Sequence, residues 1–270
     1  MSASSVDLDA VLEVALACAD DAARVLHDVP RGEIRTKKHA ADLVTDVDVA
    51  TERTVRARIA DAFPGHLVVG EELGGEPDLD GDTPTWWCDP VDGTTNLASG
   101  LPWTSFSLAL AVGREPLVGV VADLWRGEVW WTSAGGGAWR RTDDGGRERL
   151  TASSATGLAG QVLLTEWASY APWPGMLDLL AALWERHCTS RVMGSGTLSV
   201  ASVGTGRAAA AVIGSFGPED HLAALLIGLE AGAVVRDAAG RETRWPGPGP
   251  FSVAAPGVDA DLRALTTSCF

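Results

Sequence analysis

The spacing of apolar residues in the first quarter of the chain predicts two amphipathic helices. Apolar side chains recur at intervals of three and four over residues 8–27 and again over residues 46–63. This spacing gathers them on one face of a helix. Asp7 is a candidate N-cap for the first helix, and Pro64 follows the second helix and ends it.

Short apolar runs bounded by glycine, proline and aspartate predict strands further along the chain. The expected strands cover residues 67–69, 85–88, 106–110, 117–121, 128–132 and 208–213. Residues 74–84 predict a surface loop, because glycine, proline and aspartate dominate that stretch. The charged segment 140–149 predicts a hairpin tip or a subdomain boundary.

The second half of the chain alternates helical and strand-like patterns. Helices are expected over residues 176–186, 196–204 and 219–231. This order is typical of mixed sheets with helices packed outside them. We therefore expect an N-terminal α+β subdomain over residues 1–145 and a C-terminal α/β subdomain over residues 146–270.

Composition narrows the class of protein. The chain has 270 residues, 46% of them hydrophobic, and a formal net charge of −15. That charge disfavours nucleic acid or a membrane surface as a partner, but a bound divalent cation could still attract a small phosphate. The four cysteines stand far apart, which argues against a zinc knuckle or a disulfide framework. No signal-peptide pattern and no run of 18 apolar residues occurs, so the expected location is the cytoplasm.

The segment 87–96, Trp-Cys-Asp-Pro-Val-Asp-Gly-Thr-Thr-Asn, carries the most informative pattern. Asp89 and Asp92 stand at the end of an apolar strand, where their hard carboxylate oxygens suit Mg²⁺. The next four residues predict a turn and a helix start, whose backbone N–H groups can hold a phosphate. Taken alone, an Asp-Pro turn before a capped helix would explain the segment equally well.

Three other acidic stretches lie at the ends of predicted elements. They are residues 71–72 after a strand, residues 42–48 before a helix, and residues 219–220 at the start of a late helix. Each one by itself is typical of a solvated face, a helix cap or compensation of the helix dipole. Asp46 in particular is expected to cap its helix.

Together these blocks resemble one enzyme family. DLVTDVD, GEE, DPVDGTTN and a late aspartate before an EAG helix resemble, in order and spacing, the inositol monophosphatase family. The resemblance extends from about residue 12 to residue 256. It implies an α+β fold, the layered α/β/α/β/α sandwich of the inositol monophosphatase and fructose-1,6-bisphosphatase type. It also implies two or three Mg²⁺ ions per site, inhibition by lithium and a homodimer.

The resemblance assigns roles to individual residues. The implied metal ligands are Glu71, Asp89, the Val91 carbonyl, Asp92 and Asp220. The groups implied to position or deprotonate the attacking water are Asp48, Glu71 and Thr94. Phosphate contacts are implied for Gly93, Thr94 and Thr95. Substrate contacts are implied for Asp92, Gly194, Ser195, Gly196 and Asp220, and two neighbours that could line the site are Lys37 and Glu72.

Two departures from the family pattern concern the substrate. Glu219 stands where the family usually has tryptophan, and it could contact a substrate hydroxyl or amine or be only solvated. Ile213 stands where inositol-preferring members carry a glutamate, which weakens the case for myo-inositol 1-phosphate. The Thr-Thr-Asn after Gly93 argues against the nucleotide-bisphosphate branch of the family and leaves histidinol phosphate open.

The sequence thus predicts a Mg²⁺-dependent phosphomonoesterase that hydrolyses a small polyol, cyclitol or sugar-like phosphate with a metal-activated water. The alternatives are a histidinol-phosphate phosphatase and a phosphatase of a specialised pathway, for example for an aminosugar. A different class would be a non-catalytic regulator that binds metal or phosphate. Against that class, every implied ligand position holds a suitable residue.

The tryptophans and one histidine complete the list of candidates. Five tryptophans in strand-like segments are expected in the core or at a subunit interface: Trp86, Trp87, Trp125, Trp130 and Trp131. Three in loops could wall a substrate pocket: Trp103, Trp167 and Trp173. His221 is expected at the surface or behind the site, because its nitrogen donor does not match a hard, oxygen-seeking metal.

Overall fold

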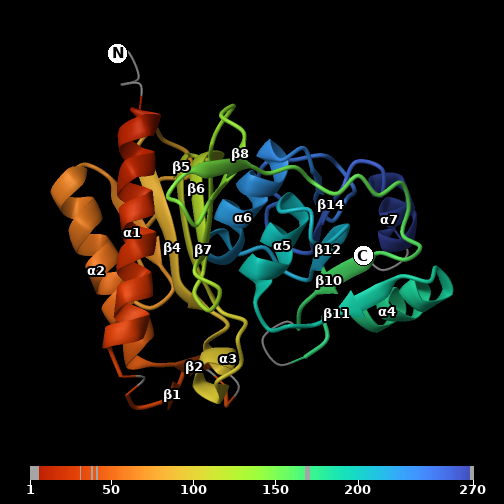
Figure 1. The fold of residues 1–270 in the computed structure, drawn as a ribbon, viewed down its shortest axis with the longest axis horizontal. Helices are drawn as coiled ribbons and strands as arrows, with labels where there is room; N and C mark the ends of the chain where they lie inside the picture. Colours follow the sequence, from red (N-terminus) through yellow and green to blue (C-terminus); the bar gives the residue numbers. More distant parts are fainter. Residues whose placement is uncertain (1–5, 31, 38, 41, 168–170, 268–270) are drawn as a thin grey trace.

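The computed structural model describes residues 6–30, 32–37, 39–40, 42–167 and 171–267. Strands follow one another from residue 105 to residue 165 in this part, and helices and strands alternate from there to residue 236 (Figure 1). The helices are α1 (Leu8–Asp28), α2 (Asp46–Ala62), α3 (Thr94–Ser99), α4 (Met176–Glu185), α5 (Gly196–Gly204), α6 (Pro218–Glu230) and α7 (Asp259–Thr266).

The first sheet is a meander that begins with one parallel pair. Its strands, in spatial order, are β3 (Leu67–Gly70), β4 (Pro84–Asp92), β5 (Ser105–Val112), β6 (Glu115–Asp123), β7 (Glu128–Ser133), β8 (Ala138–Arg141) and β9 (Arg147–Arg149). β3 and β4 run parallel, and every later pair is antiparallel. Side chains alternate across a strand, so Trp86 and Trp87 on β4 enter different cores on the two faces of the sheet.

The second sheet mixes parallel and antiparallel pairs. Its spatial order is β11 (Thr189–Arg191), β10 (Val162–Thr165), β12 (Ala210–Ile213), β14 (Phe251–Ala254) and β13 (Val234–Arg236). β10 is parallel to both β11 and β12, whereas β14 pairs antiparallel with β12 and β13. A separate hairpin joins β1 (Arg35–Thr36) and β2 (Leu43–Val44).

Helices and sheets stack in five layers (Figure 1). One core packs α1 and α2 on the outer face of the first sheet, and a central core places α5 and α6 between the sheets. A third core packs α4 and α7 on the far face of the second sheet. The contact between α6 and β6 is close, because a Cβ on Gly119 would lie 2.8 Å from the Ala223 carbonyl oxygen. The expected layered α+β sandwich is therefore confirmed.

The predicted subdomain boundary at residue 145 falls in the turn between β8 and β9, inside the first sheet. β9 ends the first sheet at Arg149, and β10 opens the second sheet at Val162. α6, from the C-terminal half of the chain, nevertheless packs on the first sheet and joins the two halves in one central core. The boundary at residue 145 stays a prediction.

The predicted helices and strands in the first 231 residues are present, with three local corrections. The strand expected over residues 85–88 continues to Asp92, so the Asp-Pro-Val-Asp segment lies on β4. Thr45 rather than Asp46 caps α2, and Asp46 pairs with Arg35 at 3.1 Å. Trp125 is 41% exposed in the turn after β6, because the Asp123 carboxylate accepts the backbone N–H groups of Trp125 and Arg126 and turns the chain outward.

The remaining tryptophans divide between core and surface. Four that were expected in strands are buried: Trp86, Trp87, Trp130 and Trp131. Of the three loop tryptophans, Trp173 is also buried, Trp103 is half-buried and Trp167 is exposed. Cys18, Cys88 and Cys188 are buried free thiols, and Cys269 lies outside the described residues. None of the described helices is both long and apolar enough to cross a membrane.

Candidate active site

The end of β4 and the start of α3 form the centre of the candidate site. The pairing of β4 with β5 is irregular between Asp89 and Asp92, and the Val91 N–H donates to Asp89 Oδ1 at 2.9 Å. Gly93 then adopts a left-handed conformation with φ +90° as the N-cap of α3. A Cβ at this position would lie 2.8 Å from the Trp103 carbonyl oxygen, so only glycine fits this turn.

Asp48 connects α2 to this turn. One carboxylate oxygen, Oδ2, accepts the Thr45 N–H at 2.9 Å and the Thr45 hydroxyl, which completes a capping box at the start of α2. The other oxygen, Oδ1, accepts the Thr94 hydroxyl at 2.9 Å. The same hydroxyl lies 3.0 Å from the Val91 carbonyl oxygen. Asp48 therefore caps α2 with one carboxylate oxygen and contacts the candidate site with the other.

Glu71 and Glu72 follow β3 and face Lys37. The Lys37 ammonium donates to Glu71 Oε1 at 2.6 Å and to Glu72 Oε1 at 2.8 Å. Burial alone would lower the pKa of Lys37, but the two glutamates outweigh burial and raise it. Burial raises the pKa of Glu72 to about 7, although the hydrogen bond from Lys37 lowers it in part. Lys37 therefore lies within hydrogen-bond distance of both glutamates, and the expectation that Lys37 and Glu72 line a metal site stays a prediction.

At the candidate site, the first turn of α5 contacts both Asp92 and the first turn of α6. Asp92 Oδ2 accepts the Ser195 hydroxyl at 2.5 Å and the Thr197 N–H at 2.7 Å. The Thr197 hydroxyl donates to the Asp220 carbonyl oxygen at 2.5 Å. These bonds bring the 194–196 turn, Asp92 and Asp220 together across more than a hundred residues of sequence.

The carboxyl groups in this region face one another at short range. Burial raises the pKa of Asp89 well above its usual range, and the charges of Glu71, Asp220 and Asp92 raise it further. Burial also raises the pKa of Asp220, with smaller contributions from Glu219 and Asp92. For Asp92, burial raises the pKa and the bonds from Ser195 and Thr197 partly offset it. We call Glu71, Asp89, Asp92 and Asp220 the acidic cluster.

The donor chemistry of the acidic cluster suits a hard cation. Its side chains offer only oxygen donors, which Mg²⁺ prefers, and a divalent cation would neutralise their dense negative charge. Within the described residues, however, no three His, Cys, Asp or Glu side chains form a ready-made metal shell. Instead, the Lys37 ammonium provides the positive charge beside Glu71.

The three residues singled out near Asp220 lie in different surroundings. The Glu219 carboxyl is partly buried in the first turn of α6, and burial raises its pKa, with a smaller contribution from the Glu71 charge. Ile213 is buried in the central core and offers no polar group. His221 is buried as well, which excludes the surface position and leaves the other expectation, a position behind the site. Its ring packs against Phe251, and burial lowers its pKa to about 4.

Three buried polar residues that support the site were not singled out from the sequence. Glu52 accepts the N–H groups of Glu72 and Leu73 and so holds the turn after β3. Glu166 accepts the Met193 and Gly194 N–H groups and the Ser199 hydroxyl. Asn96 donates to the Trp103, Met193 and Gly194 carbonyl oxygens. Two of them had a sequence signal, since Glu52 lies on the same helical face as Val55 and Ile59, and Asn96 ends the informative segment 87–96.

Comparison with known proteins agrees with this arrangement. The model of the inositol monophosphatase family matches residues 7–268. The inositol-1-monophosphatase of Mycobacterium leprae is 36% identical over 239 residues, which cover 87% of this chain and 81% of that protein. The Nus factor SuhB of Salmonella typhimurium is 30% identical over 235 residues, which cover 85% of this chain and 86% of that protein.

A solved structure agrees over almost the full length. The IMPase of Thermotoga maritima superimposes with a TM-score of 0.84 at 26% identity, covering 96% of this chain and 97% of that one. The match in sequence extends over both sheets and every segment of the candidate site. This chain therefore belongs to the inositol monophosphatase family of phosphoric monoester hydrolases.

Proposed function

We propose that this phosphatase uses Mg²⁺ to hydrolyse a small polyol, cyclitol or sugar-like phosphate. The observation that carries the proposal is the convergence of the acidic cluster, from three separate segments, on the turn at Gly93. Negative charge of this density would repel a phosphate ester unless cations lay between them. A phosphatase site of this kind therefore requires metal ions.

The residues that would hold the ions are Glu71, Asp89, Asp92, Asp220 and the Val91 carbonyl. We infer two or three ions per site, as the resemblance implies. When bound, Mg²⁺ supplies neutralisation of the phosphate charge, Lewis acidity and a lowered pKa for water. Lys37 would have to give up its contacts with Glu71 and Glu72, or share them, as the cations enter.

Asp48 and Thr94 are proposed to handle the proton of the attacking water. The Thr94 hydroxyl can take up that proton while it passes its own proton to Asp48 Oδ1, to which it already donates at 2.9 Å. Burial raises the pKa of Asp48, while the Thr45 and Thr94 hydrogen bonds lower it in part. A carboxylate with a raised pKa is a stronger general base. Glu71 is the alternative acceptor.

The phosphate is proposed to sit at the start of α3. Gly93, Thr94 and Thr95 form the first turn, and the start of a helix directs backbone N–H groups toward a bound anion. The left-handed Gly93 lets the backbone approach an anion without a side chain in the way. This arrangement would orient the ester toward Thr94 and the cations.

The substrate alcohol is proposed to lie between the 194–196 turn and the start of α6. Asp92, Gly194, Ser195, Gly196, Glu219 and Asp220 are the proposed contacts. In this region Glu219 presents a partly buried carboxylate, which can pair with a substrate amine, and Ile213 presents no polar group to a substrate hydroxyl. These side chains therefore suit an amine better than the full set of inositol hydroxyls. A phosphorylated aminosugar or histidinol phosphate is therefore the second candidate substrate.

A panel of phosphate esters tests the proposal. Phosphate release would be measured with and without Mg²⁺ on inositol phosphates, histidinol phosphate, fructose bisphosphate, nucleotide phosphates and aminosugar phosphates. We expect Mg²⁺-dependent release from one class and inhibition by millimolar Li⁺. Metal-independent hydrolysis would contradict the proposed role of the acidic cluster.

Two further proposals depend on solution measurements. A folded protein that binds Mg²⁺ but releases no phosphate from any ester would favour the regulator alternative, and one relative carries the name Nus factor. The homodimer is supported by exposed apolar side chains at Leu101, Trp125 and Met193, which a partner could cover. Light scattering at micromolar concentration would detect a monomer if this proposal is wrong.

A further inference from the structure

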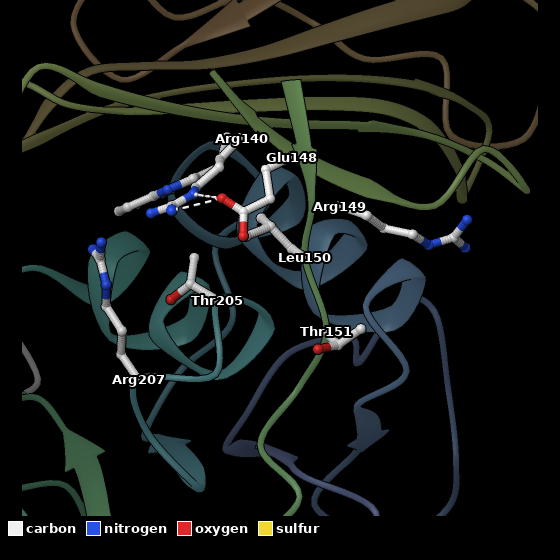
Figure 2. A pocket seen from close by; sticks show the side chains of 8 residues that line it. Arg140, Glu148, Arg149, Leu150, Thr151, Thr205 and Arg207 are labelled. Carbon is white, nitrogen blue, oxygen red and sulfur yellow. Dashed lines mark hydrogen bonds and ion pairs between the residues drawn. The ribbon is translucent and has the colours of Figure 1, made fainter. Parts of the chain in front are cut away.

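A cavity of about 230 Å³ lies beneath the β8–β9 hairpin, apart from the acidic cluster. Its lining residues are Trp130, Arg140, Glu148, Arg149, Leu150, Thr151, Thr205 and Arg207. Figure 2 shows Arg140 and Glu148 on the strand side and Thr205 and Arg207 on the α5 side, while the Arg149 guanidinium points away. We call this cavity the arginine pocket.

The arginine pocket is rich in hydrogen-bond donors. Two guanidinium groups, from Arg140 and Arg207, and two hydroxyls, from Thr151 and Thr205, line it. The Trp130 side chain also lines it, and its indole N–H is buried with no hydrogen-bond partner. That N–H is shielded from the cavity, and the Thr205 hydroxyl donates to the Ser202 carbonyl oxygen at 3.2 Å, so the donors open to an anion are the two guanidinium groups and the Thr151 hydroxyl.

Both guanidinium groups form partly exposed ion pairs. Arg140 pairs with Glu148 at 2.6 Å, and these side chains are 41% and 55% exposed. Arg207 pairs with Glu128 at 2.5 Å and also stacks over the Trp130 ring, with its guanidinium carbon 5.2 Å from the centroid. Exposed pairs of this kind contribute little, so a doubly charged anion can compete with the two carboxylates.

The backbone fixes the walls of the arginine pocket relative to each other. Gly206 has φ +72°, and a Cβ there would lie 3.0 Å from the Thr151 carbonyl oxygen. The segment that follows β9 and the turn that follows α5 are therefore in close contact. The pocket is a preformed cavity between the edge of the first sheet and the central helix layer.

We propose that the arginine pocket is a second, metal-independent binding site for the phosphate group of a small metabolite. The pocket has more hydrogen-bond donors than the two oxygens of a carboxylate ligand could satisfy. A phosphate group offers three or four acceptor oxygens and so matches the donors better. Guanidinium groups favour phosphate through paired N–H donors. On a chain with a net charge of −15, Arg140 and Arg207 give this cavity the positive charge that an anion needs.

α5 connects the arginine pocket to the candidate active site. Its first turn holds Asp92 through Ser195 and Thr197, and its C-cap, Thr205, lines the pocket. Nine residues of helix separate the two ends by about 13 Å. A phosphate held at Arg207 is therefore one short helix away from Asp92.

Titration of inorganic phosphate into the full-length protein tests the proposal. The protein is first freed of divalent cations on a chelating resin, so that the acidic cluster repels phosphate. Calorimetry is expected to show saturable binding of one phosphate per chain. Arg140→Gln and Arg207→Gln are each expected to weaken it at least tenfold, and Glu148→Gln is expected to tighten it several-fold, because a competing carboxylate is gone.

The matched control is Arg114→Gln, which removes another partly exposed arginine paired with an aspartate, Asp80. Its affinity for phosphate should equal that of the wild type. A gain of affinity in Glu148→Gln cannot come from misfolding, so this variant separates binding from a structural effect. The proposal is overturned by the absence of saturable binding, or by equal affinities in all four variants.

Discussion

The Thr94 hydroxyl donates a 2.9 Å hydrogen bond to Asp48 Oδ1 and so joins the first turn of α3 to the first turn of α2. The second oxygen of Asp48 is already occupied by the capping box with Thr45. Helix capping and proton transfer are therefore not competing explanations of Asp48. The cap fixes the carboxylate at the position where the Thr94 hydroxyl can reach it.

Removal of the Thr94 hydroxyl tests the proposed proton route. Thr94→Val keeps the shape of the side chain but leaves Asp48 without this donor. We expect kcat to fall by roughly 10²- to 10⁴-fold, the range typical of a lost general acid–base contact. Thr94→Ser keeps the hydroxyl and should retain most of the activity. Phosphate release at saturating Mg²⁺ measures both variants.

Thr54→Val provides the control for that experiment. The Thr54 hydroxyl donates to the Ala50 carbonyl oxygen at 2.9 Å within α2, away from the acidic cluster. Its loss should leave kcat unchanged. Near-normal turnover in Thr94→Val would contradict the proton route, whereas equal losses in both variants would point to general destabilisation of α2 and α3.

Asp89→Asn should abolish turnover without destabilising the metal-free protein. Asp89 is buried beside Glu71, Asp92 and Asp220, so the neutral amide relieves like-charge repulsion. We expect an unfolding temperature at or above that of the wild type in the absence of metal. Mg²⁺ should raise the unfolding temperature of the wild type by mass action and that of the variant much less. Thermal unfolding with and without Mg²⁺ and phosphate release measure these effects.

Asp61→Asn is the control for Asp89→Asn, because Asp61 is exposed near the end of α2. It should keep both the turnover and the Mg²⁺-dependent rise in unfolding temperature. If Asp89→Asn keeps near-normal hydrolysis at saturating Mg²⁺, Asp89 is not a metal ligand. A strong loss of stability in the variant would mean that the carboxylate makes a structural contact other than the Val91 N–H bond, which the amide oxygen of asparagine can also accept.

Gly70→Ala should disturb the turn that carries Glu71. A Cβ on Gly70 would lie 2.2 Å from Oε1 of Glu52, whose carboxylate is buried and holds the N–H groups of Glu72 and Leu73. We expect a loss of about 2–4 kcal/mol in the free energy of unfolding, because overpacking and the broken contacts of a buried carboxylate both contribute. Activity should fall as Glu71 moves.

Gly65→Ala is the matched control, because nothing lies within 4 Å of a Cβ at that position. Its free energy of unfolding should change by less than about 1 kcal/mol. Denaturant unfolding compares the two variants. A harmless Gly70→Ala would mean that Glu52 can move, and its proposed support of the turn would then be wrong.

The sequence predicted the elements whose patterns are long or strongly marked. The helix over residues 8–27 follows from periodicity, because it buries one regular face. The strands β4 and β5 follow from their apolar runs, because both faces of the first sheet are covered. Strands of two to four residues, such as β1 and β13, carry too few positions to show a period. Trp125 was misplaced because one aspartate, Asp123, ends β6 through bonds to the backbone that no hydropathy pattern reveals.

The candidate site was predictable where motif and chemistry coincide, as at Asp89 and Asp92. What the sequence could not show are the long-range bonds that hold it. The contact from Ser195 to Asp92 crosses 103 positions, and Glu166, which directly follows β10, binds the N–H groups of the 193–194 turn. In the sequence, Glu166 is a single acidic residue after an apolar strand, which is typical of a strand end. Only the fold shows that backbone N–H groups surround its carboxylate.

Glu166 should make the stability of the protein depend on pH. Burial raises its pKa from the ordinary 4.5 to about 7, although hydrogen bonds from Ser199, Gly194 and Met193 partly lower it. A raised pKa means that the folded state binds this proton more tightly than the unfolded state does. Below pH 4.5 the carboxyl is protonated in both the folded and the unfolded state. As the pH rises from 4.5 toward 7, the carboxyl ionises in the unfolded state first, so the free energy of unfolding decreases.

Glu166→Gln removes this titration but keeps one acceptor oxygen. Between pH 5 and pH 8, the stability of the wild type relative to the variant should therefore fall by about 3 kcal/mol at most, since each unit of pKa corresponds to about 1.4 kcal/mol. Denaturant unfolding of both proteins without metal measures the difference. Glu13→Gln, at an exposed position on α1, should differ from the wild type by less than about 0.5 kcal/mol at both pH values. If the Glu166→Gln difference is also independent of pH, the Met193–Gly194 turn is held by a carboxylate that ionises as readily in the folded state as in the unfolded one.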